Sequence, residues 1–151
     1  MTYLETITYL TGRYLQVSQF ALKNADRLIT LTEGLKEESH YFAHSSEYLD
    51  SLEAKAIALF RSQRTLSGEE LVSFFEQHEG ISEKEKKDLD KMLRKRDYLV
   101  GTYFYDNSAD LGKEDVTIYA SKIQELKELV ALADKLSVSF NKEADKLYPH
   151  F

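Results

Sequence analysis

The residues with the most distinctive chemistry lie between Arg94 and Ser108, in the stretch RKRDYLVGTYFYDNS. This stretch begins with three consecutive cations, continues into an aromatic segment and ends at a polar turn. Guanidinium and ammonium groups bind phosphates and carboxylates. The sequence therefore predicts a binding site, without catalytic or metal-ligating residues, made of Arg94, Lys95, Arg96, Asp97 and Tyr103.

Arg96 differs from its neighbours in the direction that it is expected to face. On a helix it is turned by about 200° from Arg94 and so points nearer to the apolar side. An arginine that faces inwards needs a partner, for which Asp97 and Asp106 are the local candidates. Alternatively, its stem covers the core while its head stays in water. The sequence leaves both arrangements open.

The segment from Arg96 to Tyr103 resembles the signature of HEPN-domain proteins. That signature is an arginine, a polar residue, three further residues, a histidine and commonly a tyrosine two positions later. Arg96 matches the arginine, Asp97 the polar residue and Tyr103 the tyrosine, whereas Gly101 stands at the position of the histidine. The resemblance implies a small α-helical bundle that forms a homodimer, in a family that includes many ribonucleases of toxin–antitoxin and defence systems.

Glycine at position 101 changes what the resemblance implies about activity. In the family, the arginine and the histidine of two protomers meet at the dimer interface and cleave RNA. Cleavage needs a group that moves the proton of the 2′-hydroxyl, and glycine has none. We therefore expect a non-catalytic, cytoplasmic, bacterial-type protein that acts by binding a protein or RNA partner.

Two other functions stay open. A metal-independent ribonuclease would use Arg96 with a histidine from another helix. A structural or assembly subunit would instead pack an exposed apolar helix face against a protein partner.

The histidines offer a weaker candidate for chemistry. His40 and His44 lie four positions apart, so they would share one helix face and could bind a divalent metal if a third ligand were supplied. Glu37 and His40 also match one Glu-x-x-His motif of di-iron bundles, but the chain contains no second motif. We expect no metal and no cofactor.

Composition favours an all-α protein. The chain has 151 residues, of which 42% are apolar and 30% charged, with one proline and six glycines. These values indicate a single all-helical domain, residues 1–151. The ten tyrosines are expected mainly in the core, with their hydroxyls at the surface, rather than stacked on bases. The net charge of −6 disfavours DNA as a partner, and no apolar run is long enough to span a membrane.

Apolar periodicity predicts four long helices and one short helix, packed as a bundle, with two chain topologies equally compatible. Capping boxes, in which a serine precedes a glutamate by three positions, mark two helix starts at Ser67 and Ser82. A loop is expected at residues 106–112. The predicted helices span residues 4–32 (ending at Gly34), 35–60, 71–78 (ending at Gly80), about 83–104 and 114–147.

Overall fold

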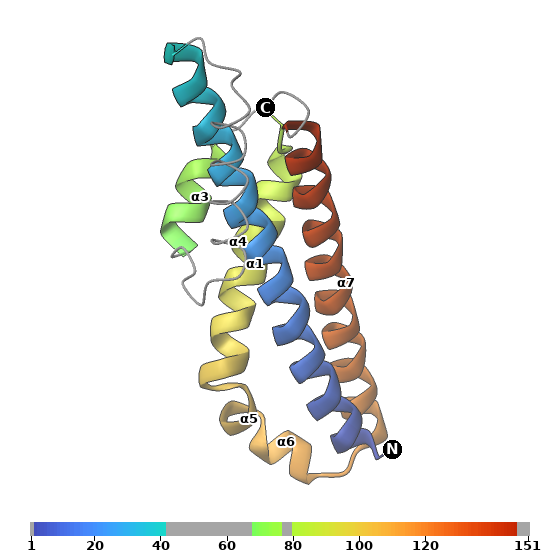
Figure 1. Ribbon diagram of the computed structural model, residues 1–151. Coiled ribbons are helices and arrows are strands. Elements are labelled where there is room, and N and C mark those ends of the chain that lie inside the picture. The colour runs from blue at the N-terminus through green and yellow to red at the C-terminus, as the bar shows by residue number, and fades with distance from the viewer. Residues whose placement is uncertain (1, 42–67, 77–79, 148–151) are drawn as a thin grey trace.

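The computed structural model describes residues 2–41, 68–76 and 80–147 and consists of helices (Figure 1). The all-α prediction is confirmed, because the described segments contain helices and no strand. The helices are α1 (Tyr3–Tyr41), α3 (Gly68–Glu76), α4 (Glu83–Gly101), α5 (Tyr103–Asp106), α6 (Ser108–Gly112) and α7 (Val116–Leu147).

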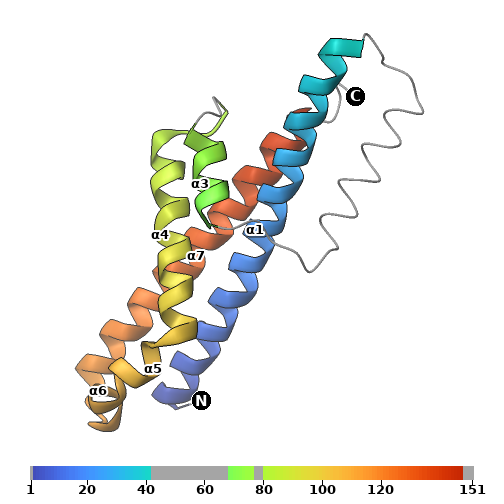
Figure 2. The same cartoon turned by 90° about the vertical axis from the view of Figure 1, so that its left-hand side faces the viewer.

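The longest helices, α1 and α7, lie side by side and run in the same direction (Figures 1 and 2). Near their first turns, the rings of Tyr3 and Tyr119 stack with centroids 5.5 Å apart. Further along both helices, Arg27 forms an ion pair of 3.2 Å with Asp145. Contacts between early residues of both helices, and again between late ones, establish the parallel arrangement.

Helix α4 runs in the opposite direction to α7. Glu85, in the first turn of α4, accepts a hydrogen bond from the hydroxyl of Ser139 near the end of α7. Lys95, two to three turns later on α4, instead pairs with Glu125 nearer the start of α7, at 3.4 Å. The sequence had left the topology open, and these contacts define it for the described helices.

Helix α1 continues through Gly34, where the sequence predicted its end. It extends to Tyr41, so the predicted boundary between helices 4–32 and 35–60 is wrong. Glycine costs about 1 kcal/mol of helix stability inside a helix. It is therefore compatible with a helix end at its position but does not require one. The rest of the predicted second helix lies outside the described residues.

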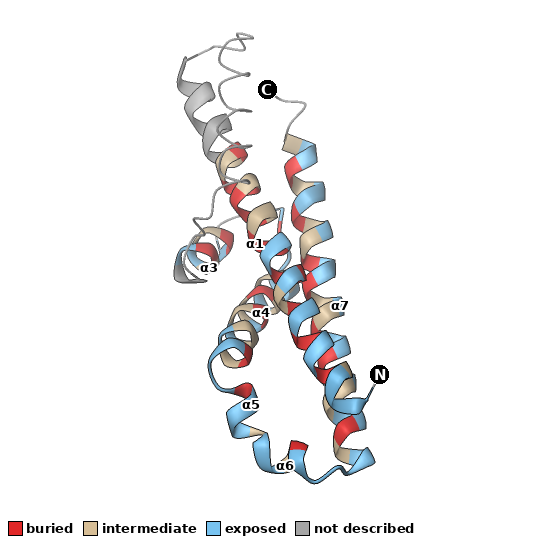
Figure 3. Cartoon of the chain, turned by 60° about the horizontal axis from the view of Figure 1, so that its bottom comes forward, coloured by how far each residue is buried: buried red, intermediate tan, exposed pale blue. Residues whose placement is uncertain are grey.

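Most of the periodic apolar positions form the core, as predicted, whereas Leu4 and Val116, in the first turns of α1 and α7, are exposed. Ile7, Tyr14, Ala21, Ala25 and Leu28 of α1 are all fully buried. A second row of apolar residues on α1 was not predicted. It is buried as well, because α1 packs against both α7 and α4. Figure 3 shows buried residues as red bands along α1 and α7. The second row is Leu10, Val17 and Leu31.

Helix α3 docks on this core through aromatic stacking. The rings of Phe75 and Phe140, on α3 and α7, lie parallel with centroids 4.9 Å apart. The ammonium group of Lys86 donates a hydrogen bond of 3.2 Å to the carbonyl of Glu76, the last residue of α3. A cation at this end complements the helix dipole. The helix begins at Gly68, earlier than the predicted start at residue 71, and its predicted end at residue 78 lies outside the described residues.

The predicted capping box at Ser82 is confirmed. The backbone N–H of Glu85 donates to the Ser82 hydroxyl at 3.1 Å, and the Glu85 carboxylate accepts from the backbone N–H of Ser82 at 3.3 Å. The sequence also contains a box that we did not predict, between Thr2 and Glu5 at the start of α1. The box expected at Ser67 lies outside the described residues.

The start of α7 combines a cap with a strained residue. The carboxylate of Asp115 accepts a hydrogen bond of 2.8 Å from the backbone N–H of Thr117, which satisfies a free donor of the first turn. Glu114, immediately before it, has a φ of 54°. This left-handed conformation is unfavourable for residues that carry a Cβ.

The segment after α4 differs from the prediction. The predicted helix of residues 83–104 is interrupted at Thr102, after which α5 begins at Tyr103, and most of the expected loop at residues 106–112 forms α6. Val100 and Phe104 belong to the apolar repeat from which that helix was predicted, yet 66% and 39% of their surfaces are exposed. Val100 is the penultimate residue of α4 and lies on its exposed side, whereas Phe104 lies after the break, in α5.

Among the described tyrosines, Tyr14, Tyr103 and Tyr119 lie in the core, whereas Tyr3, Tyr9 and Tyr105 are exposed, so the prediction is confirmed only in part. The hydroxyls of the buried tyrosines do not reach the surface as predicted. Tyr14 and Tyr119 are buried, and each donates a hydrogen bond to a backbone carbonyl, of Met92 and Leu111 respectively. The hydroxyl of Tyr103 is buried as well.

None of the helices in the described residues is long and apolar enough to cross a membrane.

Candidate functional site

The three consecutive cations do not form one surface. Successive residues of a helix are turned by about 100°, so their side chains leave α4 in different directions. Arg94 is largely exposed and forms an ion pair of 3.0 Å with Asp90, one turn earlier. Lys95 points to α7, where it pairs with Glu125 at 3.4 Å. Two of the three predicted contact residues therefore form solvent-accessible ion pairs with carboxylates.

Arg96 faces α1. Its Nε is buried and has no hydrogen-bond partner within the described part of the chain, where no ion pair with Asp97 or Asp106 occurs. Arg96 lies close enough to Tyr14 to act on its pKa. Burial raises the pKa of the Tyr14 phenol far above its ordinary value, while the charge of Arg96 lowers it and that of Asp97 raises it. The inward direction predicted for Arg96 is thus observed without either predicted carboxylate partner.

Tyr103 is a core residue. Only 5% of its surface is exposed, and its ring packs edge-on against Tyr98 and Phe104, with centroids 5.9 and 5.2 Å away. Burial, followed by the charge of Glu125 and the nearby Tyr98, raises the pKa of Tyr103 to about 12. Its hydroxyl has no hydrogen-bond partner among the described residues. A partner molecule would not reach this side chain.

Sequence reasoning missed a polar cluster next to Tyr103. Asn107, between α5 and α6, donates hydrogen bonds to the hydroxyl of Tyr98 at 3.2 Å and to the carbonyl of Tyr103 at 2.8 Å. Its side-chain oxygen accepts a hydrogen bond of 2.5 Å from Lys122 of α7. This cluster joins the end of α4 to α7. No periodic signal marks it, because its members lie on three different elements.

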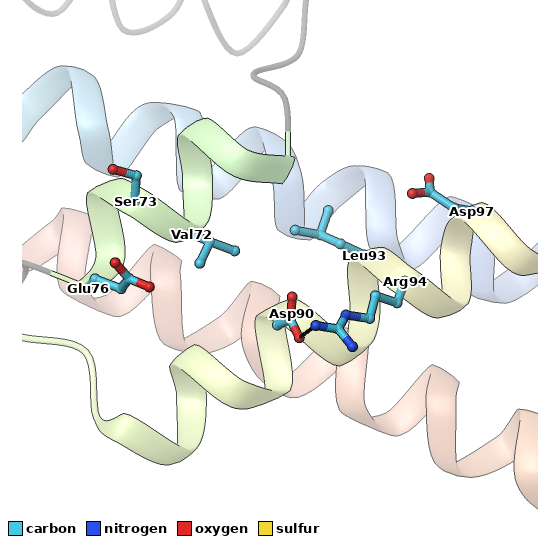
Figure 4. Close-up of a pocket in the computed structure, with 7 residues that line it drawn as sticks. All are labelled: Val72, Ser73, Glu76, Asp90, Leu93, Arg94 and Asp97. Carbon is cyan, nitrogen blue, oxygen red and sulfur yellow. Dashed lines mark ion pairs between the residues drawn. The ribbon is translucent and has the colours of Figure 1, made fainter.

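An open groove lies between α3 and α4, and two of the predicted site residues line it. It has a volume of about 380 Å³. Val72 of α3 and Leu93 of α4 lie between the two helices, and Glu76 and Asp97 lie at opposite ends of the groove (Figure 4). The full lining consists of Val72, Ser73, Glu76, Asp90, Leu93, Arg94 and Asp97.

The charge of this groove is the opposite of what the sequence suggested for the region. Three carboxylates face one guanidinium, and that guanidinium is paired with Asp90. In the described residues, no cation lies within ion-pair distance of the Glu76 or Asp97 carboxylates. A negative potential attracts cations and repels phosphate. The groove is therefore unsuited to an RNA backbone.

Gly101 is the last residue of α4 and is exposed. A Cβ added to it would meet no atom within 4 Å. Position 101 lies five residues after Arg96, which on a regular helix separates the two side chains by about 140°. Within one chain, a histidine at this position would not face the Arg96 side chain.

The described side chains include no group of three or more potential metal ligands placed to bind an ion. The four histidines, His40, His44, His78 and His150, have side chains outside the described residues, so the pairing of His40 with His44 stays a prediction. Comparison of the chain with protein-family models, with curated proteins and with solved structures found no match.

Proposed function

We propose that this protein is a non-catalytic helical binding protein that acts through a protein partner. It would be a degenerate HEPN-type domain, which keeps Arg96 and Tyr103 of the signature and has Gly101 in place of the histidine. The proposal favours the protein partner over RNA, which the sequence had left as an equal alternative.

The observation that carries the proposal is the internal pairing of the basic cluster. Proteins bind a phosphate backbone through lysines and arginines whose charge is available to replace counterions. Arg94 is paired with Asp90 and Lys95 with Glu125, and the Nε of Arg96 is enclosed. With a net charge of −6 for the whole chain, little positive potential is left to attract RNA.

RNA cleavage by the wild type, Gly101→His and Arg96→Ala tests this function. We expect no cleavage by the wild type or by Arg96→Ala. Because a side chain at position 101 meets open space, the histidine variant should fold normally. Cleavage by Gly101→His alone would support the kinship, since it would restore the missing proton-transfer group. Cleavage by the wild type that is abolished in Arg96→Ala would replace the binding function with a ribonuclease.

RNA binding supplies the second test. Fluorescence anisotropy with a labelled single-stranded RNA should show no binding at about physiological ionic strength, where the Debye length is about 8 Å. Tight binding that weakens steeply as salt is added would show contact with phosphates and would contradict the choice of a protein partner.

The HEPN resemblance also implies a homodimer, which we retain as a proposal. Val100, Phe104 and Tyr105 are exposed apolar or aromatic residues near the junction of α4 and α5, and 84% of the Tyr105 surface is accessible. Light scattering after size-exclusion chromatography would give the mass of the wild type and of Tyr105→Glu. We expect a dimer that the substitution dissociates, while Tyr9→Glu, on the exposed side of α1, leaves it intact.

A further inference from the structure

The groove between α3 and α4 combines an apolar centre with acidic ends. Val72 and Leu93 are half-buried, and each comes from a different helix. Glu76 and Asp97 are exposed and lie beyond them at the two ends (Figure 4). Asp90 is held by Arg94, so the carboxylates available to a ligand are those at the ends. The pattern is an apolar centre with a carboxylate at each end, and the cation at the Glu76 carbonyl, Lys86, is itself paired with Glu83 at 2.9 Å.

This pattern excludes several kinds of ligand. An anion would be repelled by the carboxylates. A divalent metal would need several ligands together, and the described residues contain no such group of three. A buried small molecule would need an enclosed site, whereas Ser73, Glu76, Arg94 and Asp97 leave the groove open to solvent. The ligand must carry positive charge and apolar surface, and it must fit an open groove.

An amphipathic helix has this chemistry. Helices dock into grooves between two other helices through apolar anchors at intervals of three and four residues, and flanking charges determine the choice of partner. An apolar anchor would contact Val72 and Leu93, and lysines or arginines on either side of it would reach Glu76 and Asp97. We propose that the α3–α4 groove binds a basic amphipathic helix of the partner protein. The proposal rests on the binding function above and specifies the chemistry of the partner.

The probe is a pair of synthetic peptides of about 16 residues, a length that is marginal as a free helix and can fold on binding. Both carry leucines on one face. The first has lysines flanking that face, and the second has glutamates at the same positions. Fluorescence anisotropy would measure binding to the wild type, to Asp97→Lys, to Glu76→Lys and to Leu93→Ser. Asp134→Lys on α7 is the matched control, because it changes the net charge equally at an exposed position away from the groove.

We expect the lysine peptide to bind the wild type and Asp134→Lys alike. Each groove substitution should weaken binding by about tenfold, which corresponds to roughly 1.4 kcal/mol. Asp97→Lys should gain affinity for the glutamate peptide. Higher salt should weaken the lysine complex, because surface charges are screened. Equal binding of both peptides, equal loss in Asp97→Lys and Asp134→Lys, or no binding to the wild type would overturn the proposal.

The two proposals can fail separately. Cleavage or tight binding of RNA by the wild type would remove the proposed binding function, whatever the peptides do. Absence of RNA activity together with absence of peptide selectivity would leave a binding protein whose partner does not use this groove. Circular dichroism of each variant would show that the helical fold is intact.

Discussion

The phenol of Tyr14 on α1 donates a hydrogen bond of 2.5 Å to the backbone carbonyl of Met92 on α4, and both residues are fully buried. This contact joins residues that are 78 positions apart in the chain. It fixes the position of α4 along the axis of α1. Arg94, Arg96 and one side of the groove are therefore positioned by it as well.

Tyr14→Phe should lower the free energy of unfolding by about 1–2 kcal/mol, because the hydrogen bond is lost and the Met92 carbonyl keeps only its bond within the helix. For a chain of this size that loss corresponds to a decrease of roughly 2–8 °C in the melting temperature. Tyr9→Phe is the control, since Tyr9 is 59% exposed. Equal melting temperatures for Tyr14→Phe and the wild type would show that the hydrogen bond contributes nothing to stability.

Tyr103→Phe should have the opposite effect. The Tyr103 hydroxyl is buried without a hydrogen-bond partner in the described residues, so its removal relieves a desolvation cost. We expect the free energy of unfolding to increase by about 1 kcal/mol, as measured by urea denaturation. A decrease of similar size would indicate that the hydroxyl forms a hydrogen bond in solution.

The same residue should make the wild type sensitive to alkali. The pKa of Tyr103 is about 12 in the folded chain, against 10.0 for an ordinary tyrosine. The folded state therefore holds this proton more tightly than the unfolded state does. The part of the free energy of unfolding that depends on this proton is fully present below about pH 10. It is lost as the pH rises through the folded pKa of Tyr103. Urea denaturation between about pH 8 and pH 12 should show a smaller loss for Tyr103→Phe than for the wild type.

Glu85 should give the fold a sensitivity to acid. Burial raises its pKa, but hydrogen bonds from Ser139 and Ser82 outweigh burial and hold the pKa below the ordinary 4.5. The ionised carboxylate therefore contributes stability above about pH 4.5, which is lost as the pH falls through the folded pKa. Glu85→Gln should be less stable than the wild type at neutral pH, and the difference should shrink in acid. Asp134→Asn, at an exposed position, should show no such convergence.

Glu114→Gly should stabilise the protein by about 0.5–1 kcal/mol. Glu114 has a left-handed backbone, which glycine adopts without the Cβ penalty, although glycine also gains freedom in the unfolded chain. The neighbouring Lys113→Gly should be neutral or destabilising, because its φ of −76° suits any residue. Thermal denaturation of both variants would measure the difference. A destabilised Glu114→Gly would mean that the Glu114 side chain outweighs its backbone strain.

The sequence predicted the helices and their buried faces because a 3.6-residue repeat is a local pattern. Ile7, Tyr14 and Leu28 follow that repeat within the predicted helix of residues 4–32, and all are buried. The sequence did not predict where the helix ends, since Gly34 is compatible with either outcome. The second buried row, with Leu10 and Val17, depends on how many neighbours α1 has, and that number is a property of the assembled fold.

The site was harder to predict, because its features depend on contacts between distant residues. In the sequence, the residues from Arg94 to Arg96 form one basic cluster. In the fold, however, Lys95 forms an ion pair with Glu125, 30 positions later in the chain. The bond between Asn107 and Lys122 likewise joins separate elements. The acidic groove exists because α3 docks beside α4, and no spacing within either helix indicates it.

The parallel pairing of α1 with α7 has a consequence for how the protein is made. Arg27 meets Asp145, which the ribosome adds 118 residues later. At about 5–20 residues per second, the apolar face of α1 is complete for roughly 6–24 s before that part of its partner exists. During synthesis the nascent chain therefore exposes a long apolar surface, which is a binding site for chaperones. Truncations that remove the end of α7 should accumulate as aggregates.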